Sequence, residues 1–575
     1  MRIPSAKYRP KISLLGLSLI APIYYGLLTL GHTLRHPYIV QDDARQHVVW
    51  FWRSLNPALF PDDPIADYFQ TLAPLGFRFV YGTAADLGID PLLLARLLPL
   101  PLALIATIYL FRLTWRIIPS PLSAWLATLI FNQHLWLNDD LVSATPRAFV
   151  YPLFAMFLDA LVGRSLLPCL LALGGLGLFF PQMMLVGVAV LGVRLLTWRG
   201  GRPALSQNST DWWFALAGLG VAIAIALPFT LNLSDYGPAV TAAQMRHLPE
   251  YGLGGRNEYF GVHPVTFLLH GSSGLRIPVF PSVIWAGFAL PVFLRQRSTR
   301  RETPLLRAMT PNLSILVHLL AASLGMYGLA HLLLLRLHFP SRYTYHSWRF
   351  GLAIAAGIVV AAVLERVWRW WQQRWREGLN RRDWLIGGIW ATLLATVVLV
   401  PAFPPLVFAF QGWIIGDQAA IYEYLAQQPP ETVVASMAAE ADNLPAFAHR
   451  STFVGREFVL PHHPRYYAEM TDRATRLIRA QYSPDATDLR SFLASDRINF
   501  ILLDRQSFQL NYLEQDWLIH SSLQPVTQAA INQLRGGKIP AIATVLSRCQ
   551  EVSNATYILL NAECVKTATA TPSAN

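Results

Sequence analysis

Long apolar segments recur along the first four hundred residues, and short polar stretches separate them. A helix needs about 20 apolar residues to cross a bilayer, and most of these segments approach that length. A proline at position 181 interrupts the stretch 165–197, so two short helices are expected there and not one long helix. The pattern predicts eleven membrane-spanning helices, at about residues 12–32, 91–111, 119–137, 147–163, 165–180, 182–197, 212–232, 278–294, 311–334, 349–364 and 384–407.

The last part of the chain follows a different rhythm. Short β-type runs at 432–436, 498–504 and 555–564 alternate with helical patterns at 466–482 and 487–495. The pattern predicts a polytopic α-helical membrane domain over 1–407, an extracytoplasmic soluble α/β domain over 408–565, and a disordered tail at 566–575. The loops expected outside are 33–90, 138–146, 233–277 and 335–348.

Composition supports this division. Only 14% of the 575 residues are charged, whereas soluble domains carry about 25%. The mean hydropathy of +0.35 is too low for a chain buried wholly in lipid. A membrane domain joined to a soluble domain gives this mixture.

The charge distribution predicts the orientation. The formal net charge is +12, and arginines concentrate in alternate loops, especially at 295–307 and 366–382. Loops rich in Lys and Arg stay in the cytoplasm, which puts the N-terminus inside and the C-terminal domain outside. A single helix over 165–197 would move both arginine runs outside. The basic residues therefore orient the chain, and nucleic acid is not expected as a partner.

Cysteine usage leaves one question open. Cys549 and Cys564 both lie in the C-terminal domain, where an oxidising exterior permits a disulfide. Two unpaired buried thiols fit the sequence as well. Cys169 lies within a predicted span and is expected to pack there.

An acidic pair follows the first predicted span. Asp42 and Asp43 precede an apolar and aromatic run, residues 48–55, which predicts an interfacial helix lying on the membrane plane. Two carboxylates at the water–lipid boundary suit removal of a proton from an acceptor hydroxyl, or binding of a divalent cation. The alternative is a solvated helix cap. The later acids Asp62, Asp63 and Asp67 are expected to be solvated.

A second acidic pair occurs in the loop 138–146. Asp139 and Asp140 follow Asn138, and Arg147 comes soon after. A turn and a helix start at Pro146 would also need polar residues here. Two acidic pairs on the same side of the membrane nevertheless favour a functional site.

Further cations lie in the other outside loops. Arg342 and Arg349 precede or begin the tenth predicted span, and a guanidinium suits a lipid phosphate. Anchoring to lipid headgroups is the alternative. His263 in the loop 233–277 is a further candidate for substrate binding. The histidines show no zinc spacing, so the metal requirement stays open, with a divalent cation as one option.

An N-in polytopic chain with Gln41-Asp42-Asp43 in its first outside loop and Asn138-Asp139-Asp140 in its second resembles the GT-C superfamily of membrane glycosyltransferases. The motif QDDARQH near the start resembles bacterial, cyanobacterial-type members in particular. An extracytoplasmic soluble C-terminal domain also fits the superfamily. The resemblance covers the membrane part in outline, through motifs of two to four residues.

The resemblance implies a glycosyltransferase of the bacterial cytoplasmic membrane and cell envelope. Such an enzyme transfers a sugar from a polyprenyl-phosphate donor to an extracytoplasmic acceptor, with inversion. It implies catalytic roles for Asp42, Asp43, Asp139 and Asp140. It also implies substrate-binding roles for Arg147, Arg342, Arg349 and His263, with membrane lipid as a partner. No acceptor motif is recognisable in 408–575, so the acceptor stays open.

Three other functions remain alternatives. A transporter of lipid-linked sugars would place charged groups at mid-membrane, but Asp159 is the main acid within a predicted span. A polysaccharide polymerase or ligase would rely on Arg and His loops more than on paired aspartates. A non-catalytic scaffold for envelope assembly would show the same sequence pattern.

Overall fold

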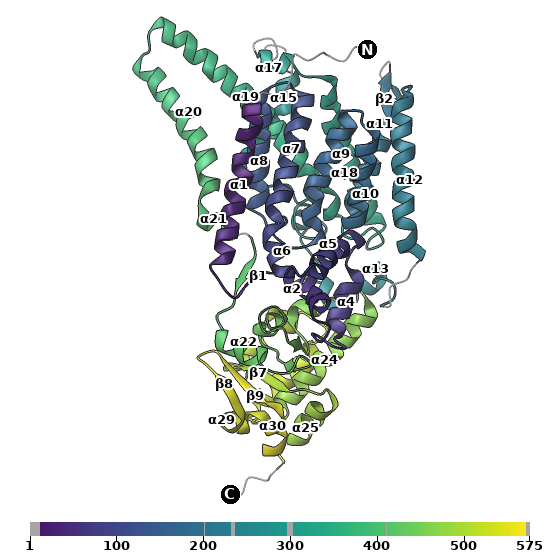
Figure 1. Ribbon diagram of the computed structural model, residues 1–575, viewed down its shortest axis with the longest axis vertical. Helices are drawn as coiled ribbons and strands as arrows, with labels where there is room; N and C mark the ends of the chain where they lie inside the picture. Colours follow the sequence, from purple (N-terminus) through teal and green to yellow (C-terminus); the bar gives the residue numbers. More distant parts are fainter. Residues whose placement is uncertain (1–11, 200–201, 232–235, 296–302, 410, 571–575) are drawn as a thin grey trace.

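The computed structural model describes residues 12–199, 202–231, 236–295, 303–409 and 411–570. Figure 1 shows an elongated molecule in which a bundle of helices stands on a smaller α/β region. The bundle is formed by residues 12–409, here called the helical part, and the α/β region by residues 411–570. The first turn of the first helix and the last helix of the chain lie at opposite ends of the long axis (Figure 1).

The helical part is dominated by helices that run roughly along the long axis. They are α1 (Ile12–Leu34), α6 (Pro91–Leu97), α7 (Pro99–Ile117), α8 (Pro121–Trp136), α9 (Val150–Val162), α10 (Leu166–Phe179), α11 (Pro181–Arg194), α12 (Ser209–Leu231), η4 (Ser282–Ala289), α15 (Leu290–Arg295), α18 (Ser314–Leu332), α19 (Ser341–Glu377) and α20 (Arg381–Leu399). Short elements join them: β2 (Leu196–Arg199), β3 (Arg202–Leu205), α13 (Ala242–Met245), η3 (Pro249–Tyr251), α14 (Pro264–Leu269), α17 (Pro304–Arg307), η5 (Pro311–Leu313), η6 (Val400–Ala402) and α21 (Pro404–Ala409).

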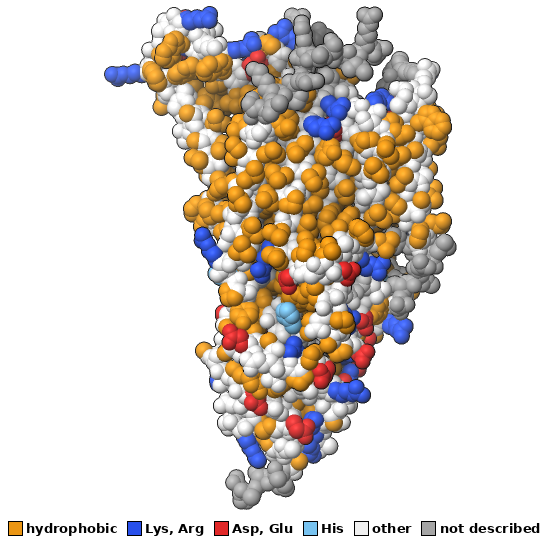
Figure 2. All heavy atoms as spheres, in the orientation of Figure 1, with side chains coloured by type: hydrophobic (Ala, Val, Ile, Leu, Met, Phe, Trp, Pro, Cys, Tyr) orange, Lys and Arg blue, Asp and Glu red, His pale blue; other side chains and the backbone are white. Residues whose placement is uncertain are grey.

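Every predicted span corresponds to helix, but not every helix is long enough to cross a bilayer alone. Six helical segments among the described residues have the length and apolar composition of a membrane span: Leu14–Leu34, Pro91–Ile117, Ser209–Pro228, Pro311–Leu332, Ser341–Glu377 and Arg381–Ala402. Figure 2 shows hydrophobic side chains covering the face of the bundle that is turned toward the viewer. The chain is thus an integral membrane protein, while the predicted count of eleven spans is not confirmed.

The break at Pro181 is confirmed. Helix α10 ends at Phe179 and α11 begins at Pro181, because a proline is tolerated in the first turn of a helix but not in its interior. The predicted arginine run 295–307 lies partly outside the described residues, since 296–302 are not among them.

Helix α19 begins earlier than predicted, and its first turns carry candidate site residues that were expected in a loop. The sequence predicted a loop up to residue 348, yet the helix begins at Ser341, directly after Pro340. Arg342, His346 and Arg349 therefore lie along its first turns, spaced four and three residues apart, on one face. His346 contacts the hydroxyl of Tyr151 (3.1 Å) and Arg349 pairs with Asp140 (2.5 Å), so these two polar residues have partners within the protein.

The first loop of the helical part folds into short helices beneath the bundle. They are α2 (Ala44–His47), η1 (Val49–Phe51), α3 (Trp52–Leu55), α4 (Pro64–Leu72) and α5 (Leu75–Asp86). The prediction of an interfacial helix exposed to lipid is wrong. Trp50 is 1% exposed, and its ring contacts Phe60, Phe69 and Phe458 of the α/β region. Phe60 and Phe69 of the first loop cover this ring together with Phe458 of the α/β region, and Phe51 packs on Phe77 and Tyr81 of α5.

Asp63 also differs from its prediction as a solvated residue. Its side chain is buried and accepts hydrogen bonds from the backbone N–H groups of Ile65 (2.9 Å) and Ala66 (3.2 Å). Asp63 is thus the N-cap of α4, a role that satisfies otherwise unpaired N–H groups at a helix start.

The α/β region is built on a five-stranded sheet with the order β6-β5-β7-β9-β8. The strands β5 (Val433–Ala435), β6 (Ser451–Thr452) and β7 (Phe500–Asp504) are parallel, whereas β9 (Tyr557–Asn561) runs antiparallel to β7 and to β8 (Gln550–Ser553). The other elements are β4 (Trp413–Ile415), α22 (Ala419–Ala426), η7 (Ala439–Asp442), α23 (Leu444–Phe447), η8 (Arg456–Phe458), α24 (Pro464–Tyr482), α25 (Ala486–Ser495), α26 (Leu510–Leu513), α27 (Asp516–Ile519), α28 (Gln524–Arg535), η9 (Ala541–Val545), α29 (Leu546–Cys549) and α30 (Ala562–Ala568).

The predicted α/β character of this region is confirmed. The predicted strands at 432–436 and 498–504 match β5 and β7, and the predicted helices match α24 and α25. The run 555–564 forms β9 and then the start of α30. Because α30 extends to Ala568, the expected disordered tail begins as helix, and residues 571–575 lie outside the described residues.

Cys549 and Cys564 form a disulfide, and Cys169 is a buried free thiol.

A two-stranded ladder ties the first loop to the α/β region. Strand β1 (Ile39–Gln41) pairs antiparallel with β4, in the register Ile39 with Ile415 and Gln41 with Trp413. The acidic pair follows β1 directly, so this ladder fixes the point from which Asp42 and Asp43 project.

Candidate active site

Asp43 is held in place by its backbone. Its N–H donates to Oε1 of Gln41 (2.8 Å), and the N–H of Asp42 donates to the carbonyl oxygen of Gly412 (2.9 Å). Asp43 is the N-cap of α2, but its carboxylate makes no capping hydrogen bond. The carboxylate therefore points away from the helix start and is available to other side chains.

Arg147 gathers three carboxylates around one guanidinium. Its Nη2 lies 2.5 Å from Oδ2 of Asp43 and 2.9 Å from Oδ2 of Asp139. Its Nε lies 3.3 Å from Oδ1 of Asp140. Planar guanidinium groups can bind several oxygens in a fixed geometry. Arg147 therefore joins Asp43 of the first acidic pair to both carboxylates of the second.

Asp140 is directed into the protein. It lies 2.5 Å from Nη1 of Arg349, and both side chains are 0% exposed. The same guanidinium donates to the hydroxyl of Tyr151 and lies 3.7 Å from the centre of the Tyr345 ring. Burial alone would raise the pKa of Asp140, but Arg349 and Arg147 hold it well below its ordinary value. Asp140 contacts both arginines, so the buried pair holds Arg147 in position.

Asp42 is turned away from Asp43. Its carboxylate pairs with Arg45, which in turn donates to Oδ1 of Asn443 in the α/β region (2.8 Å). The two adjacent carboxylates thus have different surroundings. Asp43 belongs to the Arg147 cluster, and Asp42 belongs to the contact between the helical part and the α/β region.

A cavity of about 530 Å³ opens beside Asp43, where the bundle meets the α/β region. Both parts contribute side chains to it, among them Asp43, His47, Arg147, Gln182, Arg256, His338, Arg342, Glu457 and His462. Its size is in the usual range for small-ligand sites. We call it the Asp43 cavity.

Arg342 supplies a free cation to this cavity. Its side chain is partly exposed and lies 5.6 Å from the centre of the Phe180 ring. Among the described residues no hydrogen-bond or ion-pair partner of its guanidinium is found. A guanidinium without a carboxylate partner suits an anionic ligand such as a phosphate.

Three imidazoles in the Asp43 cavity are uncharged. Burial lowers the pKa of His47 to about 4 and that of His462 to about 3, and nearby arginines contribute to both shifts. Burial and Arg342 also lower the pKa of His338 well below its ordinary value. At neutral pH these rings therefore act as hydrogen-bonding groups and not as cations.

The residues present do not form an evident metal site. No group of three or more His, Cys, Asp or Glu side chains in the described part of the chain is arranged to hold a metal ion. Asp43 and Asp139, the carboxylates that a shared cation would need, both bind Nη2 of Arg147 instead.

The remaining candidate residue lies elsewhere. His263 caps α14, where its Nδ1 accepts a hydrogen bond from the N–H of Val265 (3.3 Å), and it does not line the Asp43 cavity. Asp159, the one acid noted within a predicted span, pairs with Arg112 (3.0 Å) and Arg116 (2.7 Å). Its charge is thus neutralised by structural partners.

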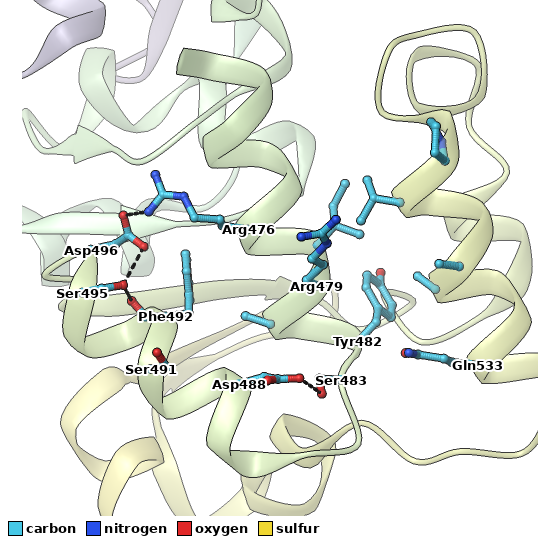
Figure 3. Close-up of a pocket in the computed structure, with 16 residues that line it drawn as sticks. Arg476, Arg479, Tyr482, Ser483, Asp488, Ser491, Phe492, Ser495, Asp496 and Gln533 are labelled. Atoms are coloured by element: carbon cyan, nitrogen blue, oxygen red, sulfur yellow. Dashed lines mark hydrogen bonds and ion pairs between the residues drawn. The ribbon is translucent and has the colours of Figure 1, made fainter. Parts of the chain in front are cut away.

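A second cavity, of about 590 Å³, lies between α24, α25 and α28 in the α/β region (Figure 3). Its polar groups largely bind one another: Arg476 pairs with Asp496, and Ser483 donates to Asp488 (2.8 Å). None of the residues predicted to form the site lines it. The Asp43 cavity is therefore the better candidate.

The sequence did not identify several residues of the Asp43 cavity. Asp43 and His47 are four residues apart, a helical spacing that could have indicated a shared face. His338, Glu457 and His462 carry no local signal, because only the tertiary fold brings them beside Asp43.

Comparison with known proteins identifies the fold. No protein-family model matches the sequence, and no curated protein matches it. The apo structure of the Archaeoglobus fulgidus oligosaccharyltransferase is similar, with a TM-score of 0.50 and 13% identity over 91% of this chain and 72% of that one. The archaeal oligosaccharyltransferase AglB from the same organism, bound to an inhibitory peptide and a dolichol-phosphate, has a TM-score of 0.50 and 11% identity over 90% and 72%. The chain has a GT-C-like fold.

Proposed function

We propose that this membrane protein with a GT-C-like fold transfers a sugar from a polyprenyl-phosphate donor to an extracytoplasmic acceptor. One observation carries the proposal: a carboxylate, Asp43, and an unpaired guanidinium, Arg342, line the same cavity at the end of the helical bundle. A transferase of this kind needs a base for the acceptor and a cation for the departing phosphate.

The proposed roles follow from the contacts. Asp43 takes the proton of the acceptor as the acceptor attacks the anomeric carbon. Arg342 stabilises the charge that develops on the phosphate as it leaves. Arg147 orients Asp43, since its Nη2 binds that carboxylate and Asp139 together. Asp140 and Arg349 hold Arg147 in position.

Inversion of the anomeric centre fits this arrangement. A retaining mechanism with a covalent intermediate requires a second carboxylate beside the base to act as a nucleophile. The carboxylate nearest to Asp43 is Asp139, which shares Nη2 of Arg147 with it (2.9 Å). Glu457 also lines the cavity and binds Arg256 (2.7 Å) and Gln46 (3.1 Å), so an arginine holds each possible nucleophile. Direct displacement by the acceptor is therefore favoured.

The proposed donor is consistent with the surroundings of the site. On the face shown in Figure 2, the apolar surface of the bundle ends near the level of the first loop, where a lipid-linked phosphate would be presented. The relative named above was solved with a dolichol-phosphate. We place the protein in the bacterial cytoplasmic membrane, with residues 1–407 as the membrane domain and residues 408–565 outside.

The test uses the two adjacent carboxylates. Asp43→Asn keeps the size of the side chain but removes the base, and loss of a general base typically costs about 10²–10⁴-fold in rate. Transfer from a radiolabelled polyprenyl-phosphate sugar by purified protein should fall accordingly. The matched control is Asp42→Asn, which changes a carboxylate bound to Arg45 and should retain most activity. Equal activity of Asp43→Asn and the unmodified protein would refute the assignment.

A further inference from the structure

Two imidazoles from distant parts of the chain lie side by side in the wall of the Asp43 cavity. His338 precedes α19, and His462 belongs to the α/β region. Their ring centres are 6.3 Å apart, and both line the cavity. Neither has a role in the proposed proton transfer or in phosphate binding.

The hydrogen-bond network fixes the tautomer of His338. The N–H of Phe339 donates to its Nδ1 (2.9 Å), so Nδ1 is the acceptor and the ring proton resides on Nε2. The backbone of His338 has a φ of +63°, a left-handed conformation that residues other than glycine keep only where the surroundings impose it. His338 is thus set to donate one hydrogen bond from Nε2.

His462 has the opposite tautomer. The hydroxyl of Tyr251 donates to the carbonyl oxygen of Pro461 (3.0 Å), and the same hydroxyl lies 3.3 Å from Nδ1 of His462. With the phenol proton directed to Pro461, the phenol oxygen is the group that can accept a proton carried on Nδ1, which favours the tautomer protonated there. The Nε2 atom of His462 therefore carries a lone pair and accepts hydrogen bonds.

The pair is uncharged, as shown by the lowered pKa values of both rings. The two rings add hydrogen-bonding groups and no charge to a wall whose nearby cation is Arg342, which contributes to the lowered pKa of both. A neutral donor next to a neutral acceptor complements hydroxyl groups, each of which can both donate and accept. Neighbouring hydroxyls of a sugar ring are of a size to engage two imidazoles at this separation.

The chemistry of the transfer also favours a hydroxyl as the reacting group of the acceptor. The nitrogen of an amide shares its lone pair with the carbonyl group and is a poor nucleophile until that resonance is broken. A hydroxyl requires only a base. Asp43 is the carboxylate that lines the cavity together with Arg342, and its contact with Arg147 is made through Oδ2.

We propose that the acceptor is itself a sugar, and that His338 and His462 bind its neighbouring hydroxyl groups while another hydroxyl reacts. This inference rests on the proposed function. The acceptor oxygen forms a bond to the anomeric carbon of the donor as the bond from that carbon to the phosphate oxygen breaks. The hydroxyl proton passes to Asp43, and the electron pair leaves with the polyprenyl phosphate beside Arg342.

Binding can be tested apart from transfer. Methyl glycosides of common hexoses would be titrated into the full-length protein in detergent and followed by saturation-transfer NMR. We expect the unmodified protein and Asp43→Asn to bind at least one glycoside. His338→Ala and His462→Ala should each weaken binding about tenfold, as expected for loss of a hydrogen bond in a partly buried site. His247→Ala, an exposed histidine outside the cavity, is the matched control and should bind normally.

A milder variant controls for misfolding of the histidine variants. Tyr251→Phe keeps the aromatic ring but removes the oxygen that fixes the tautomer of His462, so it should also weaken glycoside binding. Unchanged affinity in Tyr251→Phe together with either histidine variant would overturn the inference, as would failure of the unmodified protein to bind any glycoside.

Competition identifies the source of the sugar. A polyprenyl phosphate that carries a hexose and displaces the glycoside, where bare polyprenyl phosphate does not, would assign the imidazole pair to the donor and overturn the acceptor assignment. Failure of the two hypotheses is distinguishable. Transfer without glycoside binding would contradict only this inference, and glycoside binding without transfer would contradict the proposed function.

Discussion

Arg342 differs from Arg147 and Arg349 because it has no carboxylate partner in the described part of the chain. Asp43, Asp139 and Asp140 are shared between Arg147 and Arg349. Arg342 also lines the cavity, but no carboxylate among the described residues forms an ion pair with its guanidinium. A cation kept in a partly buried wall without a partner is costly. The cost is recovered when a phosphate binds, which is why we assign Arg342 and not Arg349 to the donor.

The buried pair of Asp140 and Arg349 yields a prediction about stability. Arg349→Met should lower the free energy of unfolding by up to about 3–5 kcal/mol, because it removes the nearer cation of a buried carboxylate and leaves only Arg147, at 3.3 Å. The double variant with Asp140→Asn should lose less than the single variant, since it leaves no uncompensated charge. Thermal and chemical unfolding in detergent would measure both.

The control lies further along the same helix. Arg369 pairs with Glu365 at the surface (2.8 Å), and exposed pairs contribute about 0–1 kcal/mol. Arg369→Met should therefore have little effect. A loss of stability in Arg349→Met no larger than in Arg369→Met would mean that the buried pair does not support the site.

Individual site residues were predictable to different degrees. Asp43 and Asp139 stood out because acids are scarce and both follow apolar spans. Their different partners could not be predicted, since the side chain of Asp42 turns to Arg45 while Asp43 meets Arg147. The separation depends on the backbone pairing of β1 with β4, to which the sequence gives no direct clue.

At the level of elements, apolar length predicted the helices well and their surroundings poorly. Residues 48–52 were expected at the membrane surface, but the structure buries them between the other short helices of the first loop and the α/β region. A hydrophobic run does not indicate whether lipid or protein will cover it. The early start of α19 was missed for a related reason, because Arg349 looked like a boundary residue while its charge is neutralised inside the protein.

The disulfide between α29 and α30 makes an element-scale prediction. Cys549 and Cys564 are 15 residues apart, and a crosslink over a loop of this size stabilises a fold by about 3 kcal/mol. Replacement of both cysteines by serine should lower the free energy of unfolding of the α/β region by about that amount. Denaturant unfolding followed by tryptophan fluorescence would measure it.

Reduction provides the matching control. A reducing agent should destabilise the unmodified protein but leave the double serine variant unchanged. Equal sensitivity of both proteins to the reducing agent would show that the crosslink does not stabilise the region.

The contact between the helical part and the α/β region contains a carboxyl group that should make stability depend on pH. Asp442 is 3% exposed, and burial raises its pKa to about 7, although Arg45 opposes the shift. In the unfolded chain an aspartate titrates near pH 4. Between these values the folded state binds more protons than the unfolded state. The contribution of Asp442 is thus fully present below about pH 4 and is lost as the pH rises through about 7.

Asp442→Asn should remove this dependence, because asparagine resembles the protonated carboxyl group. The unmodified protein should lose about 1.4 kcal/mol per pH unit relative to the variant across that interval. Unfolding measured at several pH values would show the two curves diverging toward alkaline pH. Asp472→Asn, which changes an exposed carboxylate, is the control and should leave the profile unchanged. Parallel curves for Asp442→Asn and the unmodified protein would contradict the assignment.

The arrangement of the whole molecule predicts its orientation in the membrane. Helix α15 ends at Arg295, and α19 passes into α20 through an arginine-rich turn; both points lie at the end of the bundle far from the α/β region (Figure 1). Cytoplasmic loops carry the excess of arginine, so that end should face the cytoplasm and the Asp43 cavity should face outward. Reporter fusions after residues 297 and 420 should therefore report opposite sides of the membrane. Both reporters on one side would require a different number of crossings and would place the cavity away from the proposed extracytoplasmic acceptor.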